Sequence, residues 1–279
     1  MAATTHTRIG MVNFINTAPL YEVWKRTVHH PAWRVIEAPP SDLNRLLFQS
    51  ELDLGMVSSH EYALHPDRYR ILADLSISAS GPVGSVFLFS DVRVESLAGR
   101  LVLLSNQSQT SVHLVKIVLE EFYGIAPRYA SGNVLHPEKL SEPPGAVLAI
   151  GDDALRLSRD GRYPVRLDLG EVWRQHTGLP FVFALWVVRE AFCEAYPQEV
   201  AAIHRELKRC VAEGRRDLTA ISAAVAPRIP MEPAVCYEYL QALEYDLQPE
   251  KQTALRLFFD YLIKRGEADS NALPLKIWG

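Results

Sequence analysis

Cysteine is scarce in this chain of 279 residues, and the few cysteines show no metal-binding or disulfide pattern. Cys193, Cys210 and Cys236 are 17 and 26 residues apart, with no Cys-x-x-Cys pair. This spacing argues against a disulfide framework and a zinc site. The nine histidines show no ligand spacing, and glycine-rich nucleotide motifs are absent. We therefore predict neither a metal nor an organic cofactor.

The chain also has no excess of positive charge and no long apolar run. The net charge is −4 and the isoelectric point is near 6.1, which argues against nucleic acid as a partner because phosphate binding needs a basic face. No stretch approaches the 18 or so apolar residues of a membrane span. The opening residues 1–8 lack the basic and apolar segments of a secretory signal. We expect a cytoplasmic protein without a membrane partner.

Strand and helix signals alternate through the first two thirds of the chain. Strands are expected over 8–13, 33–37, 53–58, 69–75, 101–104, 128–130, 146–150 and 165–167, and helices over 17–28, 41–49 (with Ser41 as cap), 111–123 and 152–158. Short connections between alternating elements are typical of βαβ units and a mostly parallel sheet. The predicted fold class is therefore α/β.

Two longer extended runs, near 86–90 and 184–188, bracket the inner strand–helix block, and helical patterns follow residue 189. This order predicts a two-lobed binding-protein layout in which the chain crosses to a second lobe and returns. The first lobe is expected to comprise 1–88 plus 187–279, and the second 89–186. A ligand would lie between the lobes, with the two extended runs as hinge strands.

Four short apolar runs each break into small polar residues where a helix is expected to begin. The polar stretches are 16–19, 58–59, 105–111 and 151–153. Ligands of open α/β sheets bind at the carboxyl ends of strands, where helix N-termini offer free N–H groups to anions. The pattern indicates a cleft for a small anion, although each stretch taken alone is also typical of a simple helix cap.

Several motifs resemble the chorismate dehydratases of the futalosine route to menaquinone. They are VNFINTAPL at 12–20, GSV at 84–86, TS at 110–111, IGDDAL at 150–155, DLGEVW at 168–173 and TGLPFVFALW at 177–186. The resemblance implies a two-lobed, periplasmic-binding-protein type II-like fold. It also implies a lyase that removes water from chorismate, a dicarboxylate, to form 3-[(1-carboxyvinyl)oxy]benzoate without metal or cofactor.

Two alternatives stay open. A sister family on the same fold makes 1,4-dihydroxy-6-naphthoate, but its proline-rich N-terminal signature has no counterpart here. A non-catalytic solute-binding protein would share the fold, since fold alone does not fix function. The missing export signal and lipid-attachment cysteine weigh against that reading.

The reaction implied by the resemblance requires few catalytic groups from the protein. Chorismate loses a C4 hydroxyl and a C3 hydrogen to become aromatic, so orientation, a base and charge stabilisation suffice. The four polar stretches contain no Arg or Lys, so hydroxyls and helix N-termini are expected to hold the carboxylates. The residues expected to bind substrate are Ser58, Ser59, Gly84, Ser85, Thr110, Ser111, Gly151, Phe181 and Trp186. Phe181 and Trp186 would wall the ring, but core packing is the alternative for both.

Asn16 and Asp152 are the expected catalytic residues. Asn16 can donate and accept hydrogen bonds, and could hold the C4 hydroxyl or the enolpyruvyl group; the alternative is a cap of the helix that contains Pro19. Asp152 is the one carboxylate on a turn expected to face the cleft and could be the general base. It could instead cap its helix, in which case the enolpyruvyl carboxylate of the substrate would remove the C3 proton.

Overall fold

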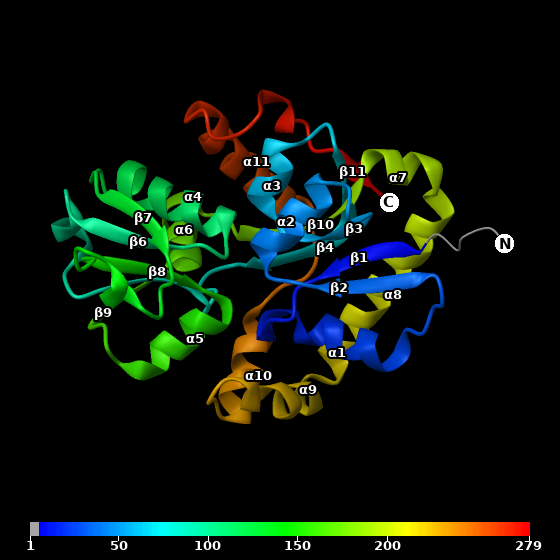
Figure 1. Ribbon diagram of the computed structural model, residues 1–279, viewed down its shortest axis with the longest axis horizontal. Helices are drawn as coiled ribbons and strands as arrows, with labels where there is room; N and C mark the ends of the chain where they lie inside the picture. Colours follow the sequence, from blue (N-terminus) through cyan, green and yellow to red (C-terminus); the bar gives the residue numbers. More distant parts are fainter. Residues whose placement is uncertain (1–5) are drawn as a thin grey trace.

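The computed structural model describes residues 6–279, which form two sheets side by side (Figure 1). The six-stranded sheet has the order β11-β4-β10-β3-β1-β2 and the five-stranded sheet the order β7-β6-β8-β5-β9. The strands of the first are β1 (Thr7–Met11), β2 (Trp33–Glu37), β3 (Leu54–Ser58), β4 (Tyr69–Ala79), β10 (Phe181–Arg189) and β11 (Ile277–Trp278). Those of the second are β5 (Val86–Ser90), β6 (Leu101–Ser105), β7 (Arg128–Gly132), β8 (Ala146–Ile150) and β9 (Val165–Asp168). We call the two units lobe 1 and lobe 2.

Each sheet has a parallel part and an antiparallel part. In lobe 1, β1 is parallel to β2 and β3, whereas β10 runs antiparallel to both β3 and β4. In lobe 2, β6 is parallel to β7 and β8, and β5 runs antiparallel to β8 and β9. The parallel strands therefore point their carboxyl ends toward one edge of each sheet, and those edges face each other across the gap between the lobes (Figure 1).

Helices cover the sheets of both lobes. Lobe 1 contains α1 (Ala18–Thr27), α2 (Pro40–Phe48), α3 (Ser59–Leu64), α7 (Glu190–Ala195), α8 (Pro197–Arg216), α9 (Leu218–Val225), α10 (Pro233–Ala242) and α11 (Pro249–Lys264). Lobe 2 contains α4 (Gln109–Ile117), continued by a π-helical turn over Val118–Phe122, then α5 (Gly151–Asp160) and α6 (Leu169–Thr177). No helix within 6–279 is long and apolar enough to cross a membrane.

The side chains of β8 show how lobe 2 is packed. Because side chains alternate across a strand, Ala146 and Leu148 enter the main core while Val147 and Ala149 enter a smaller core on the opposite face. The strand is buried throughout, as its unbroken apolar sequence predicts for a strand covered on both faces. Cys193, Cys210 and Cys236 are buried free thiols and act as core residues.

The passages between the lobes differ from the expected hinge strands. The expected boundaries at 88/89 and 186/187 fall inside β5 and β10, and each of these strands belongs to one sheet along its whole length. The chain instead crosses over residues 80–85 and again between α6 and β10. Apolar composition marked both strands correctly as extended, but only strand pairing assigns them to a sheet.

Candidate active site

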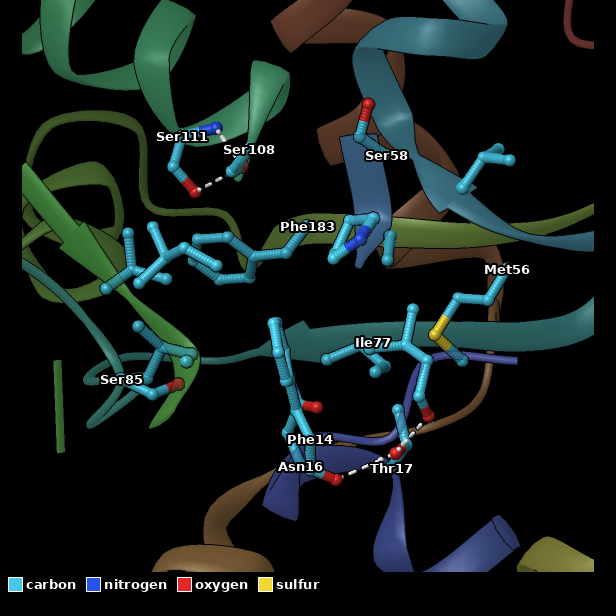
Figure 2. Close-up of a pocket in the computed structure, with 18 residues that line it drawn as sticks. Phe14, Asn16, Thr17, Met56, Ser58, Ile77, Ser85, Ser108, Ser111 and Phe183 are labelled. Atoms are coloured by element: carbon cyan, nitrogen blue, oxygen red, sulfur yellow. Dashed lines mark hydrogen bonds between the residues drawn. The ribbon is translucent and has the colours of Figure 1, made fainter. Parts of the chain in front are cut away.

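A cavity lies between the lobes at the carboxyl ends of β1, β3 and β8, with an empty volume of about 590 Å³ including its open mouth. Figure 2 shows side chains of both lobes pointing into it. The lining residues are Val12, Phe14, Asn16, Thr17, Pro40, Met56, Val57, Ser58, Ile77, Val83, Ser85, Val86, Ser108, Ser111, Ile150, Gly151, Phe183 and Ala184.

The lining is apolar apart from one amide and several hydroxyls, and no charged side chain belongs to it among the described residues. Ser108 and Ser111 lie at the start of α4, across the cavity from Asn16 and Thr17 (Figure 2). An anion bound here would therefore meet hydroxyls and the positive end of a helix rather than a guanidinium or ammonium group.

Asn16 occupies the 3₁₀ turn Ile15–Thr17 that follows β1. Its side chain makes no capping bond to α1, whose N-cap is Thr17, so the capping alternative is wrong. The side-chain Oδ1 is buried and has no hydrogen-bond partner among residues 6–279, although the residue lines the cavity. A buried acceptor without a partner is costly, and a ligand hydroxyl in the cavity would satisfy it.

The start of α4 supplies the hydroxyls of lobe 2. Ser108 is the N-cap: its Oγ accepts from the Ser111 N–H at 3.2 Å and lies 3.1 Å from the Ser111 Oγ. Thr110, expected to bind substrate, points away from the cavity, and its Oγ1 accepts from the His60 N–H at 3.0 Å. Ser108 was not among the expected substrate-binding residues, although a serine before an apolar helix is a recognisable N-cap signal.

Ser58 lines the cavity, but its hydroxyl is engaged in structural bonds. The Oγ caps α3 by accepting from the Glu61 N–H, and it accepts from the Asn44 Nδ2 at 3.0 Å. The same Asn44 Nδ2 donates to the Gln109 Oε1 at 2.9 Å, which joins α2 of lobe 1 to α4 of lobe 2. Ser59 is fully buried and donates to the Val182 carbonyl, so it does not reach the cavity.

Of the expected residues Gly84, Ser85 and Gly151, two line the cavity and one does not. Ser85 and Gly151 line the cavity, and the Gly151 N–H donates to the Ser85 carbonyl at 2.7 Å. Gly84 does not line it; its N–H donates to the Asp168 carboxylate at 2.7 Å. Gly84 and Gly151 have φ of 70° and 55°, a region that favours glycine.

The aromatic residues that were expected to wall the substrate ring belong to the core. Phe181 and Trp186 are each 1% exposed, and Phe181 packs against Trp173 and Phe258. Phe183 lines the cavity instead, near a shift in the register of β10 against β4 between Val182 and Ala184. Phe14 forms part of the opposite side (Figure 2). Neither was singled out from sequence. Phe183 lies in an apolar strand, whose sequence does not show which face an aromatic residue occupies, and Phe14 lies in the loop after β1.

Asp152 does not line the cavity. It lies in an outer groove with Asn13, Asn106 and Arg156, and Phe14 lines both the groove and the cavity. It does not cap α5, whose N-cap position is Ile150 and which has no side-chain capping bond. Its Oδ1 accepts from the Ile15 N–H of lobe 1 at 3.1 Å.

Another contact between the lobes pairs two imidazoles. His60 of α3 stacks on His113 of α4 with ring centroids 3.8 Å apart. The His60 Nε2 donates to the Glu267 carbonyl at 2.9 Å, and the buried Nδ1 has no partner within the described residues. Burial, followed by the neighbouring His113, lowers the pKa of His60 to about 4. Burial also lowers the pKa of His113, against the opposing effect of Glu267.

We expect the protein to lose stability below neutral pH because of His60. The unfolded imidazole has a pKa near 6.5 and takes up a proton first, so unfolding becomes easier as the pH falls from 6.5 toward 4. Between pH 7.5 and pH 5 the contribution of His60 to the free energy of unfolding should fall by about 2 kcal/mol. Urea unfolding at both pH values measures it.

The matched variants for this test are His60→Gln, which removes the titrating ring, and His136→Gln, which alters an exposed imidazole. His60→Gln should reduce the loss of stability between the two pH values, and His136→Gln should leave it unchanged. An unaltered loss in His60→Gln would contradict the assignment.

Among residues 6–279 there is no group of three or more His, Cys, Asp or Glu side chains placed to hold a metal ion. The polar groups that line the cavity are hydroxyls and the Asn16 amide.

A family model described as menaquinone biosynthesis matches residues 7–264. The chorismate dehydratase of Thermus thermophilus is 34% identical over 272 residues, covering 91% of this chain and 94% of that protein.

Solved structures share the fold at low sequence identity. A protein of Archaeoglobus fulgidus matches with a TM-score of 0.75 at 19% identity, covering 95% of this chain and 99% of its own. The alkanesulfonate-binding protein of Xanthomonas axonopodis pv. citri, bound to MOPS, matches with a TM-score of 0.72 at 14% identity, covering 98% of each chain. The periplasmic aliphatic sulphonate binding protein of Escherichia coli gives 0.66 at 14%, covering 99% of this chain and 92% of its own. The expected periplasmic-binding-protein-like fold is confirmed.

Proposed function

Because this chain belongs to the menaquinone-biosynthesis family, we propose that it is a chorismate dehydratase, a hydro-lyase that converts chorismate to 3-[(1-carboxyvinyl)oxy]benzoate. The observation that carries the proposal is the buried Asn16 Oδ1, which has no hydrogen-bond partner in the described part of the chain and lines a mostly apolar cavity. A biosynthetic enzyme of this kind is expected in the cytoplasm.

The polar groups of the cavity suit this substrate. One carboxylate would be held at the start of α4 by Ser108 and Ser111, where hydroxyls and the helix dipole act together. Asn16, on the opposite side, would accept from the C4 hydroxyl, and one amide N–H would donate to that oxygen as negative charge develops. Phe14 and Phe183 would hold the ring between them and exclude water.

The proton acceptor in this proposal is the enolpyruvyl carboxylate of the substrate. It takes the proton from C3, and the C3–H electron pair forms the new ring double bond as the C4–O bond breaks. The carboxylic acid so formed gives that proton to the departing hydroxide, which leaves as water, and the carboxylate is restored. No Asp, Glu or His is among the lining residues of the described chain, so the base has to come from outside that lining or from the substrate. An apolar cavity favours the substrate carboxylate as a base, since desolvation raises its pKa.

The test is to incubate the purified protein with chorismate in the presence of EDTA and to identify the product by mass. We expect loss of one water, with turnover unaffected by the chelator. Turnover abolished by EDTA and restored by a divalent ion would contradict the cofactor-free mechanism. Chorismate bound but unchanged would favour a solute-binding protein, and 1,4-dihydroxy-6-naphthoate made from that family's own substrate would favour the sister enzyme.

A further inference from the structure

The Asp152 carboxylate joins the two lobes at the rim of the cavity. Asp152 belongs to α5, which follows β8 of lobe 2, whereas Ile15 follows β1 of lobe 1. The Oδ1 of Asp152 accepts from the Ile15 backbone N–H at 3.1 Å, across 137 positions of sequence. The bond therefore exists only while these two faces are in contact.

Ile15 begins the turn that carries Asn16. Lobe 1 holds this turn through Tyr245, whose hydroxyl donates to the Asn16 carbonyl at 2.9 Å, and through Thr17, whose Oγ1 donates to the Val12 carbonyl at 2.7 Å. Asp152 adds a hydrogen bond from the opposite lobe. A small displacement of this turn would move the Asn16 amide relative to any molecule in the cavity.

The two lobes are also in close contact beside this bond. Gly151 precedes Asp152, and a Cβ built there would lie 3.0 Å from the Phe14 Cδ2. The first residue of α5 thus packs against Phe14, the residue before Ile15. Phe14 lines the cavity as well as the outer groove that contains Asp152, so the carboxylate faces the groove side of this contact.

The surroundings of Asp152 suit a structural acceptor. Burial raises the pKa of Asp152, and the Ile15 N–H opposes that rise. Arg156 of the same helix and Arg228 of lobe 1 also lower the pKa, whereas Asp153 raises it. The carboxylate thus accepts a hydrogen bond from a backbone N–H outside the cavity lining. In this position it can hold the Asn16 turn but does not face the C3 hydrogen of a substrate in the cavity.

We infer that Asp152 is a positioning residue: its bond to the Ile15 N–H fixes the Asn16 turn when the lobes are closed, and so couples the reactive geometry to closure. The inference rests on the proposed function for its kinetic consequences. Asp152 acts through Asn16 and does not itself take the proton.

Three substitutions at Asp152 separate positioning from basicity. Asp152→Asn keeps an oxygen that can accept from Ile15 but loses the basic group; Asp152→Glu keeps the base but moves the acceptor by one methylene; Asp152→Ala removes both. We expect Asp152→Asn to retain kcat within about threefold, and Asp152→Ala to lose about 10- to 100-fold, as misplaced catalytic groups do. Asp152→Glu should fall between them.

Asp153→Ala is the matched control on the same helix. The Asp153 Oδ2 accepts from the Gln107 Nε2 at 3.0 Å, a bond within lobe 2. This variant should keep wild-type kcat. A double-mutant cycle adds the specific test: if Asp152 acts through Asn16, Asp152→Ala should have little further effect in an Asn16→Ala background.

Hydrogen exchange at the Ile15 amide supplies a readout that does not depend on turnover. It should accelerate in Asp152→Ala but not in Asp152→Asn or Asp153→Ala. Should wild-type protein fail to convert chorismate, the proposed function falls while this exchange still decides whether Asp152 holds the turn.

Two results would overturn the inference. The first is an Asp152→Asn enzyme that binds chorismate but is inactive while Asp152→Glu retains activity, since that order marks a base. The second is unchanged Ile15 exchange in Asp152→Ala. Should Asp152→Ala fail to fold, the order of the Asn and Glu variants gives the same decision.

Discussion

Asn16→Ala is expected to lower kcat by about 100- to 1,000-fold, the usual effect of removing one donor that stabilises developing charge. Stability should change little, because the Asn16 side chain caps no helix and its Oδ1 has no partner within the described protein. Steady-state kinetics with chorismate and a thermal melt of the same preparation measure both effects.

Asn13→Ala is the matched control, an asparagine three residues earlier in the same loop. Its side chain is exposed and bonds to Glu37 and Arg228 rather than lining the cavity. It should retain near-normal kcat. Near-normal turnover of Asn16→Ala with a lowered melting temperature would instead show that Asn16 has a structural role.

Asp168→Ala is expected to lower the free energy of unfolding by about 4 kcal/mol, in the range for removing one partner of a buried charged network. The buried carboxylate accepts from four backbone N–H groups at 2.7–3.1 Å: those of Val83, Gly84, Gly170 and Glu171. Two of these donors start α6 and the other two lie in the passage from β4 to β5. Its loss would leave the start of a helix and a crossing between the lobes without their acceptor.

Asp168→Asn refines this test. An amide oxygen can replace the Oδ1, which accepts from Val83, Gly170 and Glu171, but the amide nitrogen would face the Gly84 N–H as a second donor. Urea unfolding should therefore show an intermediate loss. The control is Asp160→Ala, which removes an exposed ion pair to Arg162 and should cost about 1 kcal/mol or less. A loss below about 1 kcal/mol in Asp168→Ala would contradict the assigned role.

Local sequence signals predicted much of this protein correctly. Apolar runs located the strands over 33–37 and 146–150 without error and most others to within a few residues. Of the expected site residues, Asn16, Ser58, Ser85, Ser111 and Gly151 line the cavity. These signals span a few residues, because strand burial and helix initiation depend mainly on near neighbours in the chain.

These local signals do not predict contacts between segments that are far apart in the sequence. The Ile15 N–H that engages Asp152 is 137 positions away, and the Thr110 hydroxyl turns to His60, 50 positions away. The register of β10 puts Phe183, and not Phe181, beside the cavity. Which face a side chain occupies depends on how strands pair and how the lobes meet.

The sequence by itself determined the α/β class, the two-lobed layout and the Asn16 turn, because composition and periodicity act locally. Only the tertiary structure decided that β5 and β10 belong to separate sheets, that Ser108 faces the cavity, and that Asp152 spans the lobes. Those outcomes depend on pairing between segments far apart in the chain, which no local pattern specifies.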